Sequence, residues 1–303
     1  MAKIAIMGFG TVGSGVLEVC RRNAASIARR VGEPVEVKYI LDVRDFSASP
    51  DAALFTNSID TILNDPEIKV VVETIGGTRF AYPYVRQCLE SGRSVCTSNK
   101  EMVATYGAEL LALAKAHNAA FLFEASVGGG IPIIRPLHQC LGANELDDIQ
   151  GILNGTTNFI LTKMSRERMS FSQALQMAQQ LGYAEADPTA DVQGLDACRK
   201  ICILASLAFG NQLYPQLVHC QGITEVSCED VEYARSWGGV IKLIARAHRD
   251  PDTQRLSALV APMLVPHDSQ LSTVDDVFNG ILVDGDATGQ VLFYGKGAGK
   301  LPT

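Results

Sequence analysis

Residues 3–13, Lys-Ile-Ala-Ile-Met-Gly-Phe-Gly-Thr-Val-Gly, decide the fold of the first part of the chain. An apolar run predicts a buried strand over 3–7, and three glycines in the pattern Gly-x-Gly-x-x-Gly follow it directly. The first glycine permits a tight turn, the second lets the backbone approach a pyrophosphate, and the third lets the next helix pack closely on the strand. The start of that helix offers unpaired N–H groups to phosphate oxygens. The predicted dinucleotide contacts are Gly8, Gly10, Thr11, Val12 and Gly13.

Further apolar runs of strand length alternate with helical stretches along the first third of the chain. The predicted strands cover 3–7, 35–41, 69–74, 93–97 and 119–123, and the predicted helices cover 11–30, 80–90 and 101–117. This alternation is typical of an α/β fold with a parallel, doubly wound sheet of the Rossmann type. Strands of such a sheet are buried on both faces, which explains the unbroken apolar run Val70-Val71-Val72.

The pattern changes after about residue 130. Helical stretches dominate 158–209, and strand-like runs follow at 240–247, 256–264 and 281–294, with a hairpin predicted at Asp284-Gly285-Asp286. Helices followed by antiparallel-looking strands predict an α+β domain. The alternation within 240–294 leaves a second apolar face, which favours a homodimer. We therefore expect an NAD(P)-binding domain over 1–130, rejoined by 295–303, and a substrate-binding and dimerisation domain over 131–294.

Length and composition limit the classes of protein to which the chain can belong. Its 303 residues correspond to about two domains. With 26 basic and 33 acidic residues the net charge is −7, and no run of Lys or Arg exceeds two residues, so no nucleic-acid partner is expected. The longest apolar run, over 201–209 and interrupted by Ser206, is far shorter than the ~20 residues of a membrane span. Eight cysteines with apolar neighbours and no Cys-x-x-Cys pair predict buried free thiols and a soluble, cytoplasmic protein.

Two charged residues follow the second predicted strand, where the adenosine ribose of a dinucleotide would lie. Asp42 would accept hydrogen bonds from the ribose hydroxyls of NAD, whereas Arg44 would neutralise the 2′-phosphate of NADP. Residues two apart on an extended segment point the same way, so both side chains can reach one pocket. A solvated charge at a strand end explains either residue alone equally well, and the choice between NAD and NADP stays open.

Ionisable residues are dense within 182–200. Three acidic residues occupy a predicted loop, and Asp196 and Lys200 follow four residues apart, on one face of the next helix. Taken alone, this pair fits a solvated salt bridge at a helix start. The apolar run 201–204 follows directly, and a core helix does not need this density of charge beside it.

With this segment the chain resembles the homoserine dehydrogenases, which interconvert L-homoserine and L-aspartate 4-semialdehyde with NAD(P) in threonine and methionine biosynthesis. Residues 182–200 fit the family signature of a Gly, an Asp-Pro, an Asp-x-x-Gly-x-Asp and a final Lys. Further matches are Ser98-Asn99-Lys100, residues 124–132, Asn154-Gly155-Thr156-Thr157-Asn158 and Gly297-Ala298-Gly299. The resemblance covers essentially the whole chain and implies an oxidoreductase acting on a CH–OH group. Family members continue past the last of these segments with a further helix, so we expect more chain after Thr303.

The resemblance also implies roles for particular residues. Lys200 would be the acid/base group at the substrate oxygen, and Lys100 a second lysine beside cofactor and substrate. Asp191 and Asp196 would bind the substrate and orient the lysines, and the other implied substrate contacts are Glu185, Thr156 and Tyr183. The remaining cofactor contacts are Arg44, Thr74, Lys100 and Gly299. The implied ligands of a structural sodium ion, most of them backbone carbonyls, are Glu124, Val127, Gly129 and Ile131.

Two other classes of protein are weighed against this enzyme. A non-enzymatic dinucleotide-binding sensor or scaffold accounts for the glycine loop but gives no reason for the acids and the lysine of 182–200. A phosphorylating semialdehyde dehydrogenase would need a reactive cysteine and a histidine base. None of the five histidines lies in a matching motif.

Overall fold

The computed structural model describes residues 1–303, which form two compact units. One unit comprises Met1–Ser126 together with Gly299–Thr303, and the other comprises Val127–Ala298. The sequence predicts boundaries at 130 and 295, whereas the units change after residues 126 and 298. No helix in either unit has both the length and the apolar character that crossing a bilayer requires.

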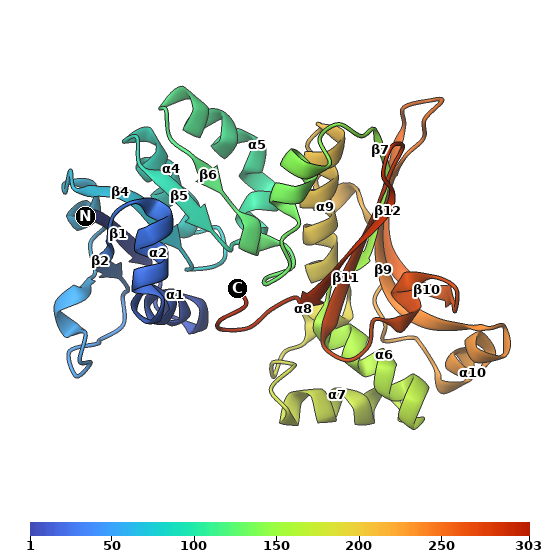
Figure 1. Ribbon diagram of the computed structural model, residues 1–303. Coiled ribbons are helices and arrows are strands. Elements are labelled where there is room, and N and C mark those ends of the chain that lie inside the picture. The colour runs from blue at the N-terminus through green and yellow to red at the C-terminus, as the bar shows by residue number, and fades with distance from the viewer. The chain divides into compact units, whose positions relative to one another are not determined.

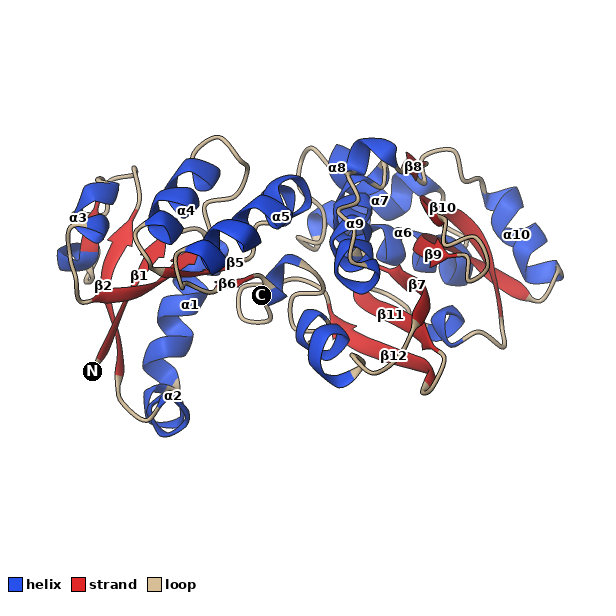
Figure 2. Ribbon diagram, turned by 90° about the horizontal axis from the view of Figure 1, so that it is seen from above, coloured by secondary structure: helices blue, strands red, loops and turns tan.

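The first unit is a parallel sheet with helices on both faces (Figure 2). Its strands are β1 (Ala2–Met7), β2 (Val35–Leu41), β3 (Phe55–Thr56), β4 (Ile68–Glu73), β5 (Ser94–Thr97) and β6 (Phe121–Leu122). Its helices are α1 (Thr11–Arg22), α2 (Ala24–Val31), α3 (Ile59–Leu63), α4 (Ala81–Glu90) and α5 (Lys100–Ala116), with short turns at Ala52–Leu54 and Glu124–Ser126. The strand order β3-β2-β1-β4-β5-β6 reverses at β1, and such a reversal is where doubly wound sheets bind nucleotides.

The predicted elements of this unit differ from the observed ones at α1, and the short elements β3 and α3 are not predicted. One helix is predicted over 11–30, but the backbone leaves the helix at Asn23, which has φ −106 and ψ 18, and α2 begins after it. Asparagine favours helix ends because its side chain competes for backbone hydrogen bonds. β3 is missed because its two residues are too few to form a pattern.

The second unit is a mixed sheet with helices packed against it (Figure 1). Its strands are β7 (Leu146–Ile152), β8 (His219–Cys220), β9 (Gly239–Arg249), β10 (Leu256–Pro266), β11 (Phe278–Gly285) and β12 (Gly289–Lys296). Its helices are α6 (Gly155–Glu167), α7 (Phe171–Gln180), α8 (Thr189–Val192), α9 (Leu195–Phe209) and α10 (Cys228–Ser236), with short turns at Pro136–Cys140, Pro215–Leu217 and Gln270–Thr273. The order is β12-β11-β7-β9-β10-β8, antiparallel except where β8 pairs with β10. This unit is therefore α+β, as the sequence predicts.

Both faces of this second sheet carry buried apolar side chains. Helix α9 packs against β7, β9 and β10. The fully buried side chains on that side include Ile149, Ala245, Val260 and Ile281. On the opposite face Ile152, Ile244, Val265 and Leu282 are buried in a core cluster, whereas the half-buried or exposed apolar side chains include Leu259, Ala261, Met263, Leu292 and Tyr294. The second face is thus apolar, with a buried core cluster and side chains on β10 and β12 that are only partly covered within one chain.

Strands β7 and β8, helix α10 and some of the thiols of the second unit depart from expectation. Strand β7 is not predicted, because Asp147, Asp148 and Gly151 interrupt its apolar pattern, yet it pairs with β11 and β9 inside the sheet. Helix α10 is also missed. The eight cysteines are all free, and the predicted burial holds for Cys88, Cys198 and Cys202. It is wrong for the exposed Cys140 and Cys228, and the other three are only partly buried.

Candidate active site

The glycine loop between β1 and α1 has the shape that a bound pyrophosphate requires. Gly8 has φ +92, and a Cβ on Gly13 would lie 2.1 Å from the Gly8 oxygen, so neither position admits a side chain. A Cβ on Gly10 would meet no atom within 4 Å, which leaves open space above the backbone. Gly10 is the N-cap of α1 and offers no side-chain acceptor. The N–H groups at the helix start, which begins with Thr11 and Val12, are therefore available to phosphate oxygens.

Two other predicted cofactor residues lie near this loop within the first unit. The Thr74 hydroxyl donates to the Gly8 oxygen at 2.8 Å and so braces the loop from the end of β4. Gly299 begins the segment that rejoins this unit and has φ +139. The next residue, Lys300, packs on α1, because a Cβ on Gly15 would lie 2.2 Å from its backbone oxygen. Thr74 and Gly299 therefore both lie near the start of α1.

Both carboxylate oxygens of Asp42 accept hydrogen bonds from Arg44 or from the glycine loop. Its Oδ1 accepts from the backbone N–H and the Nε of Arg44, both at 3.0 Å, and its Oδ2 accepts from Arg44 Nη2 and the Phe9 N–H, both at 2.8 Å. The bonds from Arg44 lower the pKa of Asp42 to about 2. The Arg44 side chain is 58% exposed and lies over the Phe46 ring. The pair therefore presents a guanidinium to solvent beside the loop.

Sequence reasoning missed a buried carboxylate at the end of β4. Glu73 is fully buried, and its Oε1 accepts from the N–H groups of Ile75 at 2.7 Å and Gly76 at 3.3 Å. Its Oε2 accepts from the hydroxyl of Thr97 at the end of β5. Burial raises the pKa of Glu73, and these hydrogen bonds oppose that rise. An acid that directly follows the apolar run of a parallel strand is the pattern that would have pointed to it.

The same network extends to the start of α5, where Lys100 lies. Thr97 Oγ1 accepts from the Asn99 N–H at 2.9 Å. Asn99 caps α5 by accepting from the Met102 N–H at 3.1 Å, and its amide donates to the Gly77 oxygen at 2.6 Å. The loops after β4 and β5 are therefore tied together, and Lys100 is fixed at the carboxyl edge of the sheet.

In the second unit, Asp196 and Lys200 form a buried pair on α9. Lys200 Nζ lies 2.8 Å from Asp196 Oδ2 and donates to the Leu153 oxygen at 2.7 Å. The two side chains are only 9% and 5% exposed, so the solvated salt bridge considered above is excluded. Desolvating such a pair is costly, and stability alone explains it poorly.

Asn154, the N-cap of α6 two residues after β7, joins this pair to a second acid. Its Nδ2 donates to Asp196 Oδ2 at 2.9 Å and to Asp191 Oδ1 at 2.8 Å. Burial raises the pKa of Asp191, and the neighbouring Asp196 charge raises it further, while Asn154 and Lys200 act in the opposite direction. Asn154 belongs to the motif Asn154-Gly155-Thr156-Thr157-Asn158, but nothing in the sequence connects it to the acids 37 and 42 residues away.

The remaining predicted substrate contacts are only partly brought together. The Thr156 hydroxyl donates to the Tyr183 oxygen at 2.7 Å, and the Tyr183 ring lies edge-on to Phe159, which places both beside the start of α6. Glu185 is exposed on the loop between α7 and α8, where its backbone oxygen accepts from Gln179 at 3.1 Å.

The four predicted sodium ligands fall on both sides of the boundary between the units. Glu124 opens the short turn of the first unit, and the other three belong to the second. Val127 and Ile131 are buried, and Gly129 has φ +51. A Cβ on Gly129 would lie 2.6 Å from the Gly297 oxygen, so the backbone of this loop is held closely against the residues after β12.

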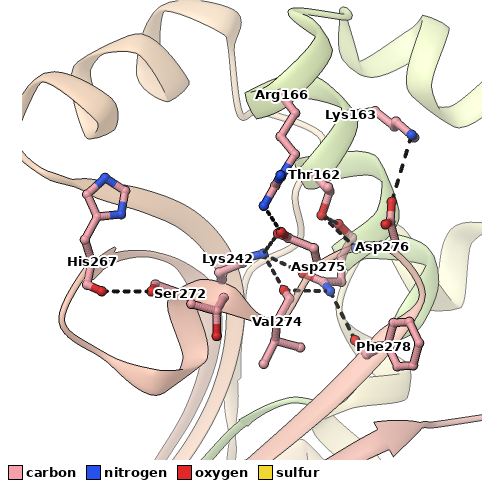
Figure 3. A network of polar contacts seen from close by, with 12 residues as sticks. Thr162, Lys163, Arg166, Lys242, His267, Ser272, Val274, Asp275, Asp276 and Phe278 are labelled. Carbon is pink, nitrogen blue, oxygen red and sulfur yellow. Dashed lines mark hydrogen bonds and ion pairs between the residues drawn. The ribbon is translucent and has the colours of Figure 1, made fainter.

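A buried polar network fixes α6 against the sheet (Figure 3). Lys242 Nζ on β9 donates to Asn158 Oδ1 at 3.1 Å. It also donates to the Val274 oxygen at 2.6 Å and lies 3.1 Å from Asp275 Oδ1. Burial lowers the pKa of Lys242, and Asp275 opposes that shift. Asn158 lies one turn after Asn154 on α6. The network therefore also fixes the start of α6, where Asn154 binds the Asp191 and Asp196 carboxylates.

Comparison with known proteins identifies the family. A family profile described as "Homoserine dehydrogenase, NAD binding domain" matches residues 8–124, and one described as "Homoserine dehydrogenase" matches residues 132–303. A homoserine dehydrogenase of Synechocystis sp. is 44% identical over 99% of this chain and 70% of its own length. The crystal structure of a homoserine dehydrogenase from Thiobacillus denitrificans matches with a TM-score of 0.94 at 42% identity, over 99% of this chain and 70% of that chain.

A third match adds a cofactor complex. The structure of a hyperthermophilic archaeal homoserine dehydrogenase mutant in complex with NADPH matches with a TM-score of 0.82 at 29% identity, over all of this chain and 93% of that chain. The profile matches together span both units, and the identities hold along the whole chain. The chain belongs to the homoserine dehydrogenase family of NAD(P)-dependent oxidoreductases.

Proposed function

We propose that the chain interconverts L-homoserine and L-aspartate 4-semialdehyde with NAD(P), and that Lys200 is its acid/base group. The observation that carries this proposal is the buried contact of the Lys200 ammonium with Asp196 and the Leu153 oxygen. A hydride leaves an alcohol carbon only as the hydroxyl proton departs, so a nearby group must take up that proton and return it in the reverse direction. When bound, NAD(P) supplies the hydride acceptor or donor, and the protein supplies position and proton transfer.

The acids around Lys200 would bind the substrate. Homoserine and the semialdehyde each carry an ammonium group. Asp191, on α8 beside the start of α6, can form an ion pair with it. Asp191 is only partly exposed and burial raises its pKa, so a substrate cation would offset the cost of burying its charge. Thr156 and Tyr183 would line the same pocket, and Glu185 would meet the amino group from its exposed loop.

Lys100 would act from the first unit. It is the first residue of α5, directly after β5, at the edge of the sheet where doubly wound folds hold their ligands. The positive charge of Lys100 would there help to bind both the cofactor and the substrate carboxylate. Asn99 and Glu73 would keep this helix start in place through the bonds described above.

The cofactor is proposed to be NADP in preference to NAD. The open backbone at Gly10 and the uncapped start of α1 fit the pyrophosphate of either molecule. Both oxygens of Asp42 are already engaged by Arg44 and the Phe9 N–H, so ribose hydroxyls would have to compete for them. The exposed Arg44 guanidinium instead offers a charged fork for the 2′-phosphate of NADP.

A sodium ion is proposed at Glu124, Val127, Gly129 and Ile131. A carboxylate and backbone carbonyls are the oxygen ligands that a hard cation prefers. The close packing of Gly129 on Gly297 supports this proposal, because it holds the backbone of the loop in one conformation. Thermal unfolding in sodium chloride compared with choline chloride tests it. Equal melting temperatures in the two salts would count against the ion.

A homodimer is proposed through the partly covered face of the second sheet. Leu259, Ala261 and Met263 share one face of β10, and all are half-buried in the single chain. A second copy of this face would bury that apolar surface. Light scattering at micromolar concentration should give twice the chain mass of 32.5 kDa, and a monomer mass would contradict the proposal.

The activity is tested by absorbance at 340 nm with L-homoserine and NADP⁺ or NAD⁺. Homoserine-dependent reduction of the cofactor is expected, and iodoacetamide should leave it largely intact because no cysteine takes part. Loss of activity with iodoacetamide would favour the cysteine-dependent semialdehyde dehydrogenase. Cofactor binding without homoserine-dependent reduction would favour the non-enzymatic sensor.

A further inference from the structure

Asn154 occupies a position where one amide serves two different structures. It is 5% exposed and is the N-cap of α6. Its Oδ1 accepts from the backbone N–H of Thr157 at 2.9 Å and from the Thr157 hydroxyl at 3.0 Å. Because the oxygen is engaged by the helix, the Nδ2 must point the other way. The orientation of the amide is thus set by the cap itself, which removes the usual ambiguity between oxygen and nitrogen.

The Nδ2 group points at two carboxylates from two different helices. Asp191 comes from α8 and Asp196 from the first turn of α9. An amide nitrogen has two hydrogens, and these are used one on each acid, at 2.8 Å and 2.9 Å. Two carboxylates this close repel each other when both are ionised. The amide lies where it can offset that repulsion.

Lys200 depends on the same point of the chain. The Asp196 oxygen that accepts from Asn154 also lies 2.8 Å from Lys200 Nζ. The oxygen of Leu153, the residue before Asn154, accepts directly from Lys200 at 2.7 Å. The end of β7 therefore holds the ammonium both directly and through a carboxylate. Asn158, one turn along α6, is anchored to Lys242, so this end of the helix is itself fixed.

We propose that Asn154 is a positioning residue: its amide keeps the Asp191 and Asp196 carboxylates ionised side by side and thereby fixes the Lys200 ammonium for proton transfer. The inference rests on the proposed function of Lys200. Asn154 does not itself exchange a proton with the substrate. Its contribution is to the charge state and the direction of the groups that do.

Asn154→Ser separates this role from helix capping. Serine is also a strong N-cap, so α6 keeps its start, but the shorter side chain has one donor and cannot bind both acids. In the reductive direction, with L-aspartate 4-semialdehyde and NADPH, the acid limb of kcat/KM reports the carboxylates that must be ionised. We expect kcat/KM to fall about tenfold or more and the acid limb to move up by about one pH unit. The reason is that the free energy of a hydrogen bond to a charged group corresponds to about one pKa unit. Asn154→Asp should move the limb further, because it adds a third carboxylate.

The matched control is Ser170→Ala, which removes the cap of the neighbouring helix α7 without touching the acids. It should lower the melting temperature and leave the pH profile unchanged. A merely structural role for Asn154 predicts the same outcome for Asn154→Ser, and that outcome would overturn the proposal.

A second measurement needs no catalysis. In protein labelled with ¹³C at the aspartate carboxyls, the Asp191 signal should titrate at higher pH in Asn154→Ser than in the unsubstituted chain. An unchanged titration would reject the positioning role even if homoserine oxidation is seen. An inactive chain with the expected shift would instead reject the proposed function and leave the role of the amide intact.

Discussion

Arg44 and Asp42 form a bidentate pair, with Arg44 Nε 3.0 Å from Asp42 Oδ1 and Arg44 Nη2 2.8 Å from Asp42 Oδ2. The carboxylate thus holds the guanidinium beside the glycine loop. We expect Arg44→Ala to raise the dissociation constant for NADPH about tenfold or more while changing that for NADH little, because only NADPH carries the 2′-phosphate. Fluorescence titration of both cofactors measures this, with the exposed Arg22→Ala as control. Equal losses for the two cofactors would show that Arg44 does not recognise the phosphate.

Gly10→Ala and Gly13→Ala should fail in different ways, although both add one methyl group. The methyl at residue 10 meets no protein atom within 4 Å, so the melting temperature should stay near that of the unsubstituted chain while cofactor affinity drops. The methyl at residue 13 would lie 2.1 Å from the Gly8 oxygen, so that variant should lose stability. Calorimetry and cofactor titration of both variants test the pair. Unchanged cofactor affinity in Gly10→Ala would contradict the pyrophosphate site.

Glu73 predicts a pH dependence of stability with a definite sign. Burial raises the pKa of Glu73 in the folded state. Between the unfolded pKa of about 4.3 and the raised folded pKa, the folded chain therefore binds more protons than the unfolded chain. In that range the free energy of unfolding falls as pH rises. In Glu73→Gln this contribution is absent. The melting temperature of the unsubstituted chain minus that of the variant should therefore be largest near pH 4 and shrink toward neutral pH. A difference that grows with pH would mean that the hydrogen bonds outweigh burial.

The sequence predicts best what depends on local pattern. The glycine loop, the parallel strands of the first unit and the pairing of Asp196 with Lys200 on one helix face all follow from spacing of a few residues. The α+β character of the second unit follows from the order of its elements. These features need no knowledge of which distant segments meet.

The features that the sequence does not predict depend on tertiary contacts between distant segments. β7 contains two acids and a glycine, and only its place between β11 and β9 makes it a strand. The engagement of both Asp42 oxygens is not predicted from the sequence, because the contact to the Phe9 N–H comes from another loop. Asn154 and Glu73 act on residues that tertiary folding brings to them. Long-range hydrogen bonds leave no periodic pattern in a single sequence.

Lys242→Met should destabilise the second unit strongly. The substitution keeps much of the side-chain volume but removes a buried ammonium, leaving Asn158 Oδ1 and the Val274 oxygen without this donor. Breaking a buried ion pair by removing one partner typically costs about 3–5 kcal/mol, and Arg166 remains to pair with Asp275. Denaturant unfolding should therefore show a loss near the lower end of this range. Lys163→Met, in the same region, breaks the pairs with Glu167 and Asp276 and removes the ammonium over the Phe159 ring, and it should cost about 1 kcal/mol or less (Figure 3). Equal costs would contradict a special role for the buried lysine.

Lys200→Ala is the most direct test of the mechanism. General acid–base catalysis contributes about 10²–10⁴-fold, so kcat should fall by that factor because the lost interaction belongs to the transition state. Cofactor affinity should hardly change, since the glycine loop belongs to the other unit. Lys100→Ala should instead lower both kcat and NADPH affinity, because Lys100 begins α5 at the carboxyl edge of the nucleotide-binding sheet. Lys115→Ala, in the last turn of the same helix, serves as the control that should change neither. Steady-state kinetics and NADPH titration of the three variants distinguish the roles. An unchanged kcat in Lys200→Ala would rule out proton transfer by Lys200 and transfer that role to Lys100.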